Sequence, residues 1–370
     1  MNKGRRLDLE WWDQEGDDCL RVRGWTGAEL SELGRLAATE LSRRLAVLPS
    51  EFVVSGASLS SIQPIAGRFE VSSDVVSFTP RFPFLDGLGY SLLVDLSPRE
   101  QDSGPEVWNI QRPPPEGPPT TDVVAIYPSG DQLPVNQLKF YVHFSSPMSD
   151  GFASRAIQVL RADSGQAIQG VFLTMDPELW DPERRRLTLL LDPGRIKRGL
   201  VPNLEAGYPL VEGSPIILAI DTHFRDAAGR PLRNGAKRRY DIGPPLRVRV
   251  VPADWQCQAP VAGSKNPLVV EFDRPLDQAL LEHSLRVNDP AGLTLAGQTT
   301  VGSGEKSWQF VPQSPWQEGR HQVMIDPRLE DQAGNSLLRV FDRDLTRAED
   351  APAADGHVSV EFNCLGPTTA

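Results

Sequence analysis

The feature that most constrains the fold of this chain is an internal repeat of short, strand-like segments. Residues 78–87 read FTPRFPFLDG and residues 310–319 read FVPQSPWQEG, with phenylalanine, two prolines, an aromatic residue and glycine at matching positions. Each copy is followed by an apolar segment that ends in aspartate, YSLLVD at Asp95 and HQVMID at Asp326. Self-similarity of this kind indicates that one supersecondary unit recurs along the chain.

Two further correspondences extend the repeat to the middle of the chain. Residues 212–232 (EGSPIILAIDTHFRDAAGRPL) match residues 318–337 (EGRHQVMIDPRLEDQAGNSL), including two aspartates that precede an Ala-Gly pair. Residues 140–148 (FYVHFSSPM) align with residues 268–276 (LVVEFDRPL), which places Met148 opposite a leucine. The middle and the end of the chain are therefore predicted to share one architecture.

The repeats divide the chain into three units. The stretch RPPPEGPP, from Arg112, is a stiff and extended spacer because it is rich in proline. The segment HVSVEF, from His357, is able to add one more strand after the third unit. We predict an atypical first unit (1–105), a linker (106–119), two units of one kind (120–248 and 249–345) and a C-terminal tail (346–370).

The local pattern predicts a mainly β fold of tandem antiparallel β-sandwiches. In FYVHF the apolar residues alternate with Tyr141 and His143, which is the period of a half-buried strand with these two side chains on its solvent face. The 33 prolines and 31 glycines are scattered, as expected for many turns between short strands. Short strands separated by turns favour sandwiches over parallel sheets with crossover helices.

One segment of the first unit is predicted to be an amphipathic helix. TGAELSELGRLAATELSRRLAV begins with Thr26 and Glu29 in the positions of a capping box, and leucines recur at helical spacing after it. We expect this helix over residues 27–45. It makes the first unit a decorated version of the other two.

Composition excludes some classes of function. The formal net charge of −11 argues against nucleic-acid binding, because such proteins need a basic face against the phosphates. No stretch approaches the roughly 20 apolar residues of a membrane helix. The N-terminal stretch MNKGRRLDLEWWDQEGDD lacks the apolar region of a signal peptide. Three widely spaced cysteines (Cys19, Cys257 and Cys364) offer no disulfide framework.

Two motifs resemble a known family. Residues 126–151 (IYPSGDQLPVNQLKFYVHFSSPMSDG) and residues 329–337 (LEDQAGNSL) resemble the opening strand and the closing hairpin of bacterial Ig-like domains of the surface-layer SbsA type. The resemblance covers the middle and last units best. It implies Ig-like β-sandwiches and a periplasmic or extracellular setting, although the chain as given carries no export signal and a cytoplasmic setting stays open.

Metal sites are weighed at two places. His143 and Met148 are a reasonable ligand pair for copper, but their positions fit an outward histidine and a core methionine better. The pairs Asp221/Asp226 and Asp326/Asp331, with Asn335, offer oxygen ligands for calcium, yet Asp or Asn before Gly is also what a hairpin turn requires. We expect turns at these positions, and neither a metal nor a cofactor.

One basic cluster is the best candidate for a binding patch. PERRRLTLLLDPGRIKRG surrounds an apolar strand and is suited to an anionic glycan, lipid headgroup or acidic partner; the same charges can also shield an edge strand. The candidate residues are Arg184, Arg185, Arg186, Arg195, Lys197 and Arg198. The eight tryptophans also suggest a glycan-binding surface, because sugars stack on exposed aromatic rings. Trp316 is expected in a core, and the sequence does not place Trp11, Trp12, Trp180 and Trp255.

These observations favour a non-enzymatic, multi-domain structural or binding module of the bacterial cell envelope, whose partner is an envelope protein or a glycan. Motifs of the common nucleophilic, zinc and nucleotide-binding enzymes are absent from the sequence. The alternative is a carbohydrate-active or accessory enzyme with two catalytic carboxylates in a cleft between units. Exposed tryptophans beside such a cleft would favour the enzyme, and buried ones the module.

Overall fold

The computed structural model describes residues 7–14, 17–50, 53, 64–96, 105–113, 117–175, 177–344, 347, 350, 352 and 358–366. The chain forms two compact units. One comprises Met1–Thr120 with Arg225–Pro231, and the other comprises Thr121–Phe224 with Leu232–Ala370. The first unit contains one β-sandwich, and the second contains two, which we call the second and third sandwiches.

The first sandwich has two antiparallel sheets. One sheet has the strand order β1 (Asp8–Gln14), β2 (Asp17–Arg23), β5 (Val76–Pro80) and β4 (Gly67–Val71). The other has the order β3 (Leu45–Pro49), β6 (Gly89–Val94) and β7 (Glu106–Gln111). Helices α1 (Gly27–Leu33) and α2 (Ala38–Arg44) connect β2 to β3.

The second sandwich repeats this arrangement. One sheet has the order β8 (Val123–Tyr127), β10 (Lys139–Phe144), β13 (Arg186–Leu190) and β12 (Leu179–Trp180). The other has β11 (Ile157–Arg161), β14 (Ile216–Ile220), β15 (Ala236–Gly243) and β9 (Gln132–Pro134), which runs parallel to β15. The connections contain α4 (Ala153–Ala156), α5 (Pro193–Ile196) and α6 (Val201–Ala206).

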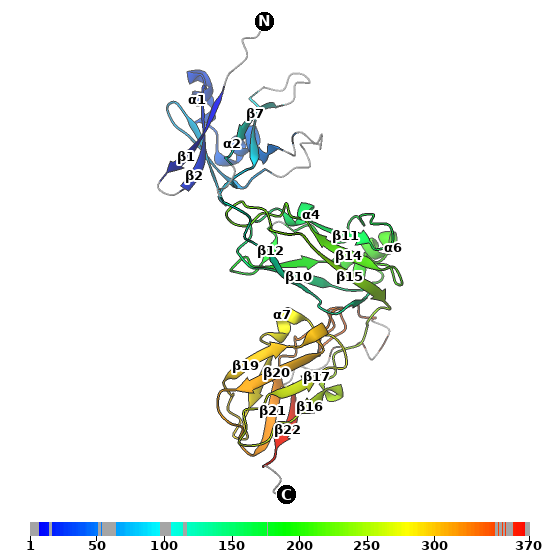
Figure 1. Cartoon of the computed structure of the whole chain (residues 1–370). Helices are drawn as coiled ribbons and strands as arrows, with labels where there is room; N and C mark the ends of the chain where they lie inside the picture. The colour runs from blue at the N-terminus through cyan, green and yellow to red at the C-terminus, as the bar shows by residue number, and fades with distance from the viewer. Residues whose placement is uncertain are drawn as a thin grey trace. The chain divides into compact units, whose positions relative to one another are not determined.

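The third sandwich (Figure 1, yellow to red) is built in the same way. One sheet has β16 (Gln256–Gln258), β17 (Leu268–Glu271), β20 (Ser307–Pro312) and β19 (Gly297–Val301). The other has β18 (Leu285–Asn288), β21 (Gly319–Ile325) and β22 (Val358–Cys364). Helix α7 (Gln278–Leu281) and the single 3₁₀ turns η2 (Pro252–Asp254) and η3 (Ser303–Glu305) complete it.

Lettering the strands of each sandwich from A to G in chain order gives the same two sheets every time, ABED and CFG, with β9 as an added strand in the second sandwich. This is the strand distribution of constant-type immunoglobulin domains. The predicted fold class, mainly β with tandem antiparallel Ig-like sandwiches, is confirmed. The first unit is not atypical in strand order, and differs in the helices between its B and C strands.

The matched sequence segments occupy matched positions in space. In both FTP and FVP copies the phenylalanine ring passes over a glycine of the neighbouring D strand, Gly67 under Phe78 and Gly297 under Phe310. A β-carbon at either glycine would lie within 2.5 Å of a ring carbon, so a larger residue does not fit there. The repeat therefore preserves a packing contact as well as a strand pattern.

The aspartate pairs build hairpins, as the turn prediction states. Oδ1 of Asp226 accepts hydrogen bonds from the N–H groups of Ala228 and Arg230, both at 2.9 Å. Oδ1 of Asp331 accepts from the N–H groups two and four residues ahead, at 2.9 and 3.0 Å. Gly229 and Gly334 follow with φ of 78° and 80°, a conformation that favours glycine.

The predicted helix over residues 27–45 is wrong in its length. The capping box of Thr26 and Glu29 is present, but α1 ends at Leu33 with Gly34 as its C-cap. After α2, Leu45 begins strand β3 and pairs with a valine of β6. The apolar spacing of LAVLP fits a strand, because alternate side chains in it enter the core, and burial in the sheet decides the outcome.

Two predicted boundaries also need correction. Residues 106–111, assigned to the linker, form β7, because Trp108 and Ile110 pack on the first core. Residues 358–364, assigned to the tail, form β22 and pair along the full length of β21. Residues 114–116 of the proline-rich stretch lie outside the described part of the chain.

Each sandwich has its own apolar core between its two sheets. None of the helices in the described ranges has both the length and the apolar character needed to cross a bilayer. We call residues 337–344, in the connection between β21 and β22, the strap. It begins with Leu337 in the third core and packs with Phe341 against the second.

Candidate functional site

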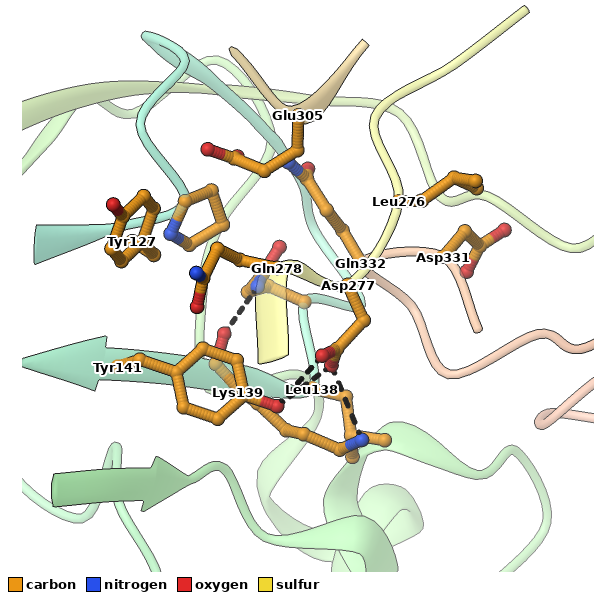
Figure 2. Close-up of a pocket in the computed structure, with 12 residues that line it drawn as sticks. Tyr127, Leu138, Lys139, Tyr141, Leu276, Asp277, Gln278, Glu305, Asp331 and Gln332 are labelled. Carbon is orange, nitrogen blue, oxygen red and sulfur yellow. Dashed lines mark hydrogen bonds and ion pairs between the residues drawn. The ribbon is translucent and has the colours of Figure 1, made fainter. Parts of the chain in front are cut away.

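A cluster of buried polar groups lies between the second and third sandwiches, and we call it the junction. It begins at Tyr141 on strand β10, whose side chain is only 6% exposed. The hydroxyl group of Tyr141 donates to the carboxylate of Asp277, with distances of 2.8 and 3.0 Å to the two oxygens (Figure 2). The prediction that Tyr141 faces solvent is wrong, because the third sandwich covers this face of the sheet.

Asp277 holds groups from both sandwiches. It is the N-cap of α7, where it accepts from the N–H of Leu280 at 3.1 Å. Nζ of Lys139, from β10, lies 3.3 Å from Asp277 and 2.7 Å from Glu330. Burial alone would lower the pKa of Lys139, but the two carboxylates outweigh it and raise that pKa above its ordinary value. The lysine is therefore a charged bridge between one strand and two segments of the other sandwich.

A second buried carboxylate, Glu305, joins the two sandwiches at η3. Its side chain is 1% exposed, and both oxygens accept from the N–H of Ser129 at 3.0 Å. The hydroxyl oxygen of Ser129 in turn accepts from the N–H of Gly304 at 2.9 Å. Burial raises the pKa of Glu305, and the hydrogen bonds from Ser129 act against this rise.

The Asp331 hairpin forms the third part of the junction. Its Gln332 carbonyl accepts from the N–H of Leu138, at 2.9 Å, in the second sandwich. Nδ2 of Asn335 donates to Asp331 and, at 3.1 Å, to the carbonyl of Leu246. Burial raises the pKa of Asp331 to about 7, while its hydrogen bonds and Arg274, 3.6 Å away, act in the opposite direction. Asp331 and Asn335, two of the residues weighed as calcium ligands, thus serve a turn that also connects the sandwiches.

The strap supplies the fourth part. Asp342, 3% exposed, accepts from the backbone N–H of Arg198 at 2.9 Å and from its Nε at 2.7 Å. Nε of Arg247 donates to the same carboxylate at 2.8 Å. The strap is therefore bound through Asp342 to Arg198 and Arg247, which precede it in the chain.

The arrangement leaves little space for a ligand. The cavity lined by Tyr141, Asp277 and Glu305 measures about 10 Å³, which is room for one water molecule at most and far too little for a sugar ring. Its carboxylates already have protein partners, as Figure 2 shows for Asp277. What the junction does chemically is to pair the charges of two sandwiches with one another.

The structure separates His143 from Met148. Met148 is fully buried in the core of the second sandwich, whereas His143 lies on the other face of the sheet, half-buried, with its ring 5.1 Å from that of Tyr127. Burial lowers the pKa of His143. Over the described part of the chain, no group of three or more His, Cys, Asp or Glu side chains is placed to hold a metal ion.

The predicted basic patch is divided among several structural roles. The backbone of Arg184 (φ 53°) closes the turn before β13, and Arg185 donates to the carbonyl of Ser145 at 2.6 Å. Arg186 lies 3.7 Å from Glu282 of the third sandwich. Arg186 thus contacts the third sandwich, whereas the partners of Arg184 and Arg185 lie within the second.

The other three members lie in the connection that contains α5 and α6. Arg195 donates to main-chain carbonyls, Lys197 lies over the ring of Phe341 at 4.4 Å, and Arg198 binds Asp342. The assignment of the six residues to an anionic ligand stays a prediction, and the structure does not gather them into one site.

The tryptophans are mostly internal. Trp316 is 3% and Trp255 is 6% exposed, so the core position predicted for Trp316 is confirmed. Trp11 and Trp180 are half-buried against other aromatic rings. Of the eight tryptophans, all of which the structure describes, Trp12 is the one that is exposed, at 43%, and the guanidinium group of Arg21 lies over its ring.

Comparison with known proteins adds limited detail. No family profile matches the chain, and no curated protein matches it. Among solved structures, Escherichia coli alpha-2-macroglobulin domains MG0-NIE-MG1 is 11% identical with a TM-score of 0.21, covering 88% of this chain and 96% of that one. Surface layer protein SbsC, domains 1–6, is 9% identical with a TM-score of 0.18, covering 98% and 55%. The Ig1-2 module of the Drosophila receptor phosphatase DLAR is 11% identical, with a TM-score of 0.20, covering 57% and 91%.

At such identities and TM-scores these comparisons carry no inference about activity, and the chain spans about half the length of the SbsC structure. The strand order of the three sandwiches defines the class directly. The chain is a multi-domain Ig-like β-sandwich protein. The narrower resemblance to SbsA-type domains stays a prediction.

Proposed function

We propose that this protein is a non-enzymatic Ig-like module of the bacterial cell envelope, with a structural role or a role in binding an envelope protein or glycan. The observation that carries the proposal is the use of charge at the junction. Lys139, Asp277 and Glu305 join two sandwiches, at one of the places where the enzyme alternative expects an open cleft. A chain that joins its sandwiches in this way is suited to presenting loops and strand edges at a defined spacing.

The charged contacts of the junction support a structural role for the protein. Removing one partner of a buried ion pair leaves an uncompensated charge, so each buried carboxylate here depends on its partner in the other sandwich. Lys139 has two carboxylate partners and Asp342 has two arginine partners. The two sandwiches are therefore joined through several charged contacts.

Cell fractionation tests the proposal. The protein is tagged at its own chromosomal locus with the upstream region intact, and periplasm, membranes, medium and cytosol are probed separately. We expect recovery in an envelope fraction or the medium. Recovery in the cytosol alone would rule out the envelope role and leave only the statement about fold.

A further inference from the structure

The second sandwich contains an insertion that the other two lack. The connection from the E strand to the F strand spans residues 81–88 in the first sandwich and 313–318 in the third. In the second sandwich it spans residues 191–215 and contains helices α5 and α6. Since all three sandwiches share the same strand order, the fold itself does not require this longer segment.

The insertion is firmly anchored to the sandwich. The guanidinium group of Arg195 donates to four main-chain carbonyls, that of Gly170 and those of residues 206–208, at 2.7 to 3.3 Å. Ile196 is fully buried in the core, and Asp192 caps α5. Arginine with this many fixed partners defines the position of the whole segment, so the surface it presents is built into the fold.

That surface is apolar. Leu200, Val201 and Leu204 are 45%, 63% and 72% exposed, and α6 buries none of its residues. Val201 and Leu204 stand three positions apart on one helix and therefore lie on the same side of it. Exposed apolar residues that occur singly need no explanation, but three of them on one anchored turn mark an interaction surface.

Positive charge borders the apolar turn. Lys197 and Arg198 directly precede it, and Arg247 lies beside Arg198 on the carboxylate of Asp342. Lys197, Arg198 and Arg247 outnumber Asp342 and Glu205 by one positive charge. Asp192 and Arg195 at α5 cancel each other. The segment thus has a basic edge and an apolar tip, although the whole chain is acidic.

We propose that residues 197–204 dock on an anionic lipid surface. Leu200, Val201 and Leu204 enter the boundary between headgroups and acyl chains, and Lys197 and Arg198 stay at the level of the phosphates. A second copy of this chain is disfavoured as the occupant, because three side chains cover far less than the roughly 800 Å² per partner of a stable interface. The inference rests on the proposed envelope function for the presence of a membrane.

Vesicle sedimentation with the full chain tests this docking. The probes are vesicles of phosphatidylcholine alone and vesicles that also contain phosphatidylglycerol. We expect binding to the anionic vesicles, weakened about tenfold or more by Leu204→Ser or Val201→Ser, because apolar burial drives insertion. Leu293→Ser, at an equally exposed leucine (67%) of the third sandwich, is the matched control and should bind as the unaltered chain does.

Charge variants distinguish the electrostatic from the apolar contribution to vesicle binding. Lys197→Gln should weaken binding to anionic vesicles several-fold and Glu205→Gln should strengthen it, with both effects reduced by salt. No sedimentation of the unaltered chain, an equal loss in Leu293→Ser, or a dimer in solution that Leu204→Ser dissociates would each overturn the proposal. Vesicle binding and cell fractionation fail independently, so a cytosolic protein that binds vesicles would contradict the envelope role alone.

Discussion

The hydroxyl group of Tyr141 links the two sandwiches of the second unit at the scale of a single residue. It donates to Asp277, and both residues are 6% exposed. Tyr141→Phe keeps the ring and leaves the carboxylate one donor short. A hydrogen bond to a charged acceptor is worth about 1.5–3 kcal/mol, and we expect a loss of that size in the free energy of unfolding, measured with denaturant.

Tyr127 provides the control for this measurement. It lies at the same junction, half-buried against His143, and burial raises its pKa, but no hydrogen bond of its hydroxyl group contributes to that rise. Tyr127→Phe should therefore change the free energy of unfolding by much less. Equal losses in the two variants would show that the contact with Asp277 is not what Tyr141 contributes.

Glu178 gives the second sandwich a pH dependence. Burial, followed by the neighbouring Asp150, raises the pKa of Glu178 to about 7, although the N–H groups of Ala153 and Trp180 donate to its carboxylate. The unfolded chain releases this proton near the ordinary pKa of 4.5 and the folded chain near 7, so the folded state binds more protons between these values. Stability contributed by this group is full below pH 4.5 and falls as the pH rises to 7.

We expect Glu178→Gln to remove the part of the pH dependence of stability that comes from this carboxyl group. The free energy of unfolding of the variant should fall less between pH 5 and pH 7 than that of the unaltered chain, by about 1–3 kcal/mol. Denaturant titrations at several pH values measure this slope. Asp331, whose pKa is also raised to about 7, contributes with the same sign in both proteins and cancels in the comparison. A slope that does not change would contradict the raised pKa.

The structural role of some residues could be predicted from the sequence, and that of others could not. The aspartate before Ala-Gly was predictable as a turn former, because its hydrogen bonds run to the backbone two and four residues away. The burial of Tyr141 was not predictable. The alternation of side chains along a strand shows which of them share a face, but not what covers that face. The partner of Tyr141 lies 136 positions away in the chain, and no local pattern contains it.

At the scale of the element, the hairpin of Asp331 approaches the second sandwich closely at Leu138. A β-carbon on Gly334 would lie 2.5 Å from a side-chain carbon of Leu138 in the second sandwich, at a residue whose φ is already 80°. Gly334→Ala should therefore lower the free energy of unfolding by roughly 2–4 kcal/mol, from backbone strain together with the clash. Denaturant unfolding measures the loss.

Gly292→Ala isolates the strain from the clash. Gly292 has a φ of 86°, and a β-carbon there meets nothing within 4 Å. We expect a loss of roughly 1–2 kcal/mol, from the left-handed backbone alone. If both variants lost the same amount, the close approach of the hairpin to Leu138 would have no energetic weight.

Elements also show where local patterns reach their limit. The capping box fixed the start of α1 because it involves residues only three positions apart. The end of that helix and the start of β3 depend on pairing with β6, which lies far along the chain, so the leucines after Gly34 were assigned to the wrong period. A leucine at the boundary between a helix and a strand fits both the helical and the strand spacing of apolar residues.

At the scale of the whole molecule, the junction predicts cooperative unfolding of the second and third sandwiches. We expect calorimetry of the full chain to show one heat-absorption peak for both, since the strap and the hairpin both bridge them. Asp342→Ala removes the acceptor of two arginines and should split this peak in two. The measurement needs no isolated fragment.

Asp241→Ala is the matched control for that experiment. Asp241 pairs with Arg239 at 3.0 Å on the surface of the second sandwich, and both side chains are more than half exposed. Exposed pairs contribute little, so this variant should leave a single peak. A single peak in Asp342→Ala as well would show that the strap does not couple the two sandwiches.

The number of sandwiches and their kinship were predictable from the repeats, because each copy must bury the same core positions. The joining of the second and third sandwiches was not, since the residues that join them differ from one sandwich to the next. Lys139 and Tyr141 have cysteine and arginine, or proline and valine, at the corresponding positions of the first and third sandwiches. The repeat conserves what each sandwich needs internally, and the contacts between them lie outside it.

The route of the strap has a consequence for biosynthesis. A ribosome releases β21, which ends at Ile325, before the strap, and it releases the strap before β22, which begins at Val358. At about 5–20 residues per second, the edge of β21 waits roughly 2–6 seconds for its partner strand. In that interval the nascent chain presents an open strand edge, which is a template for pairing with other chains. Slow codons in this stretch would lengthen the exposure, and a chaperone that covers β21 would be needed most at this point of translation.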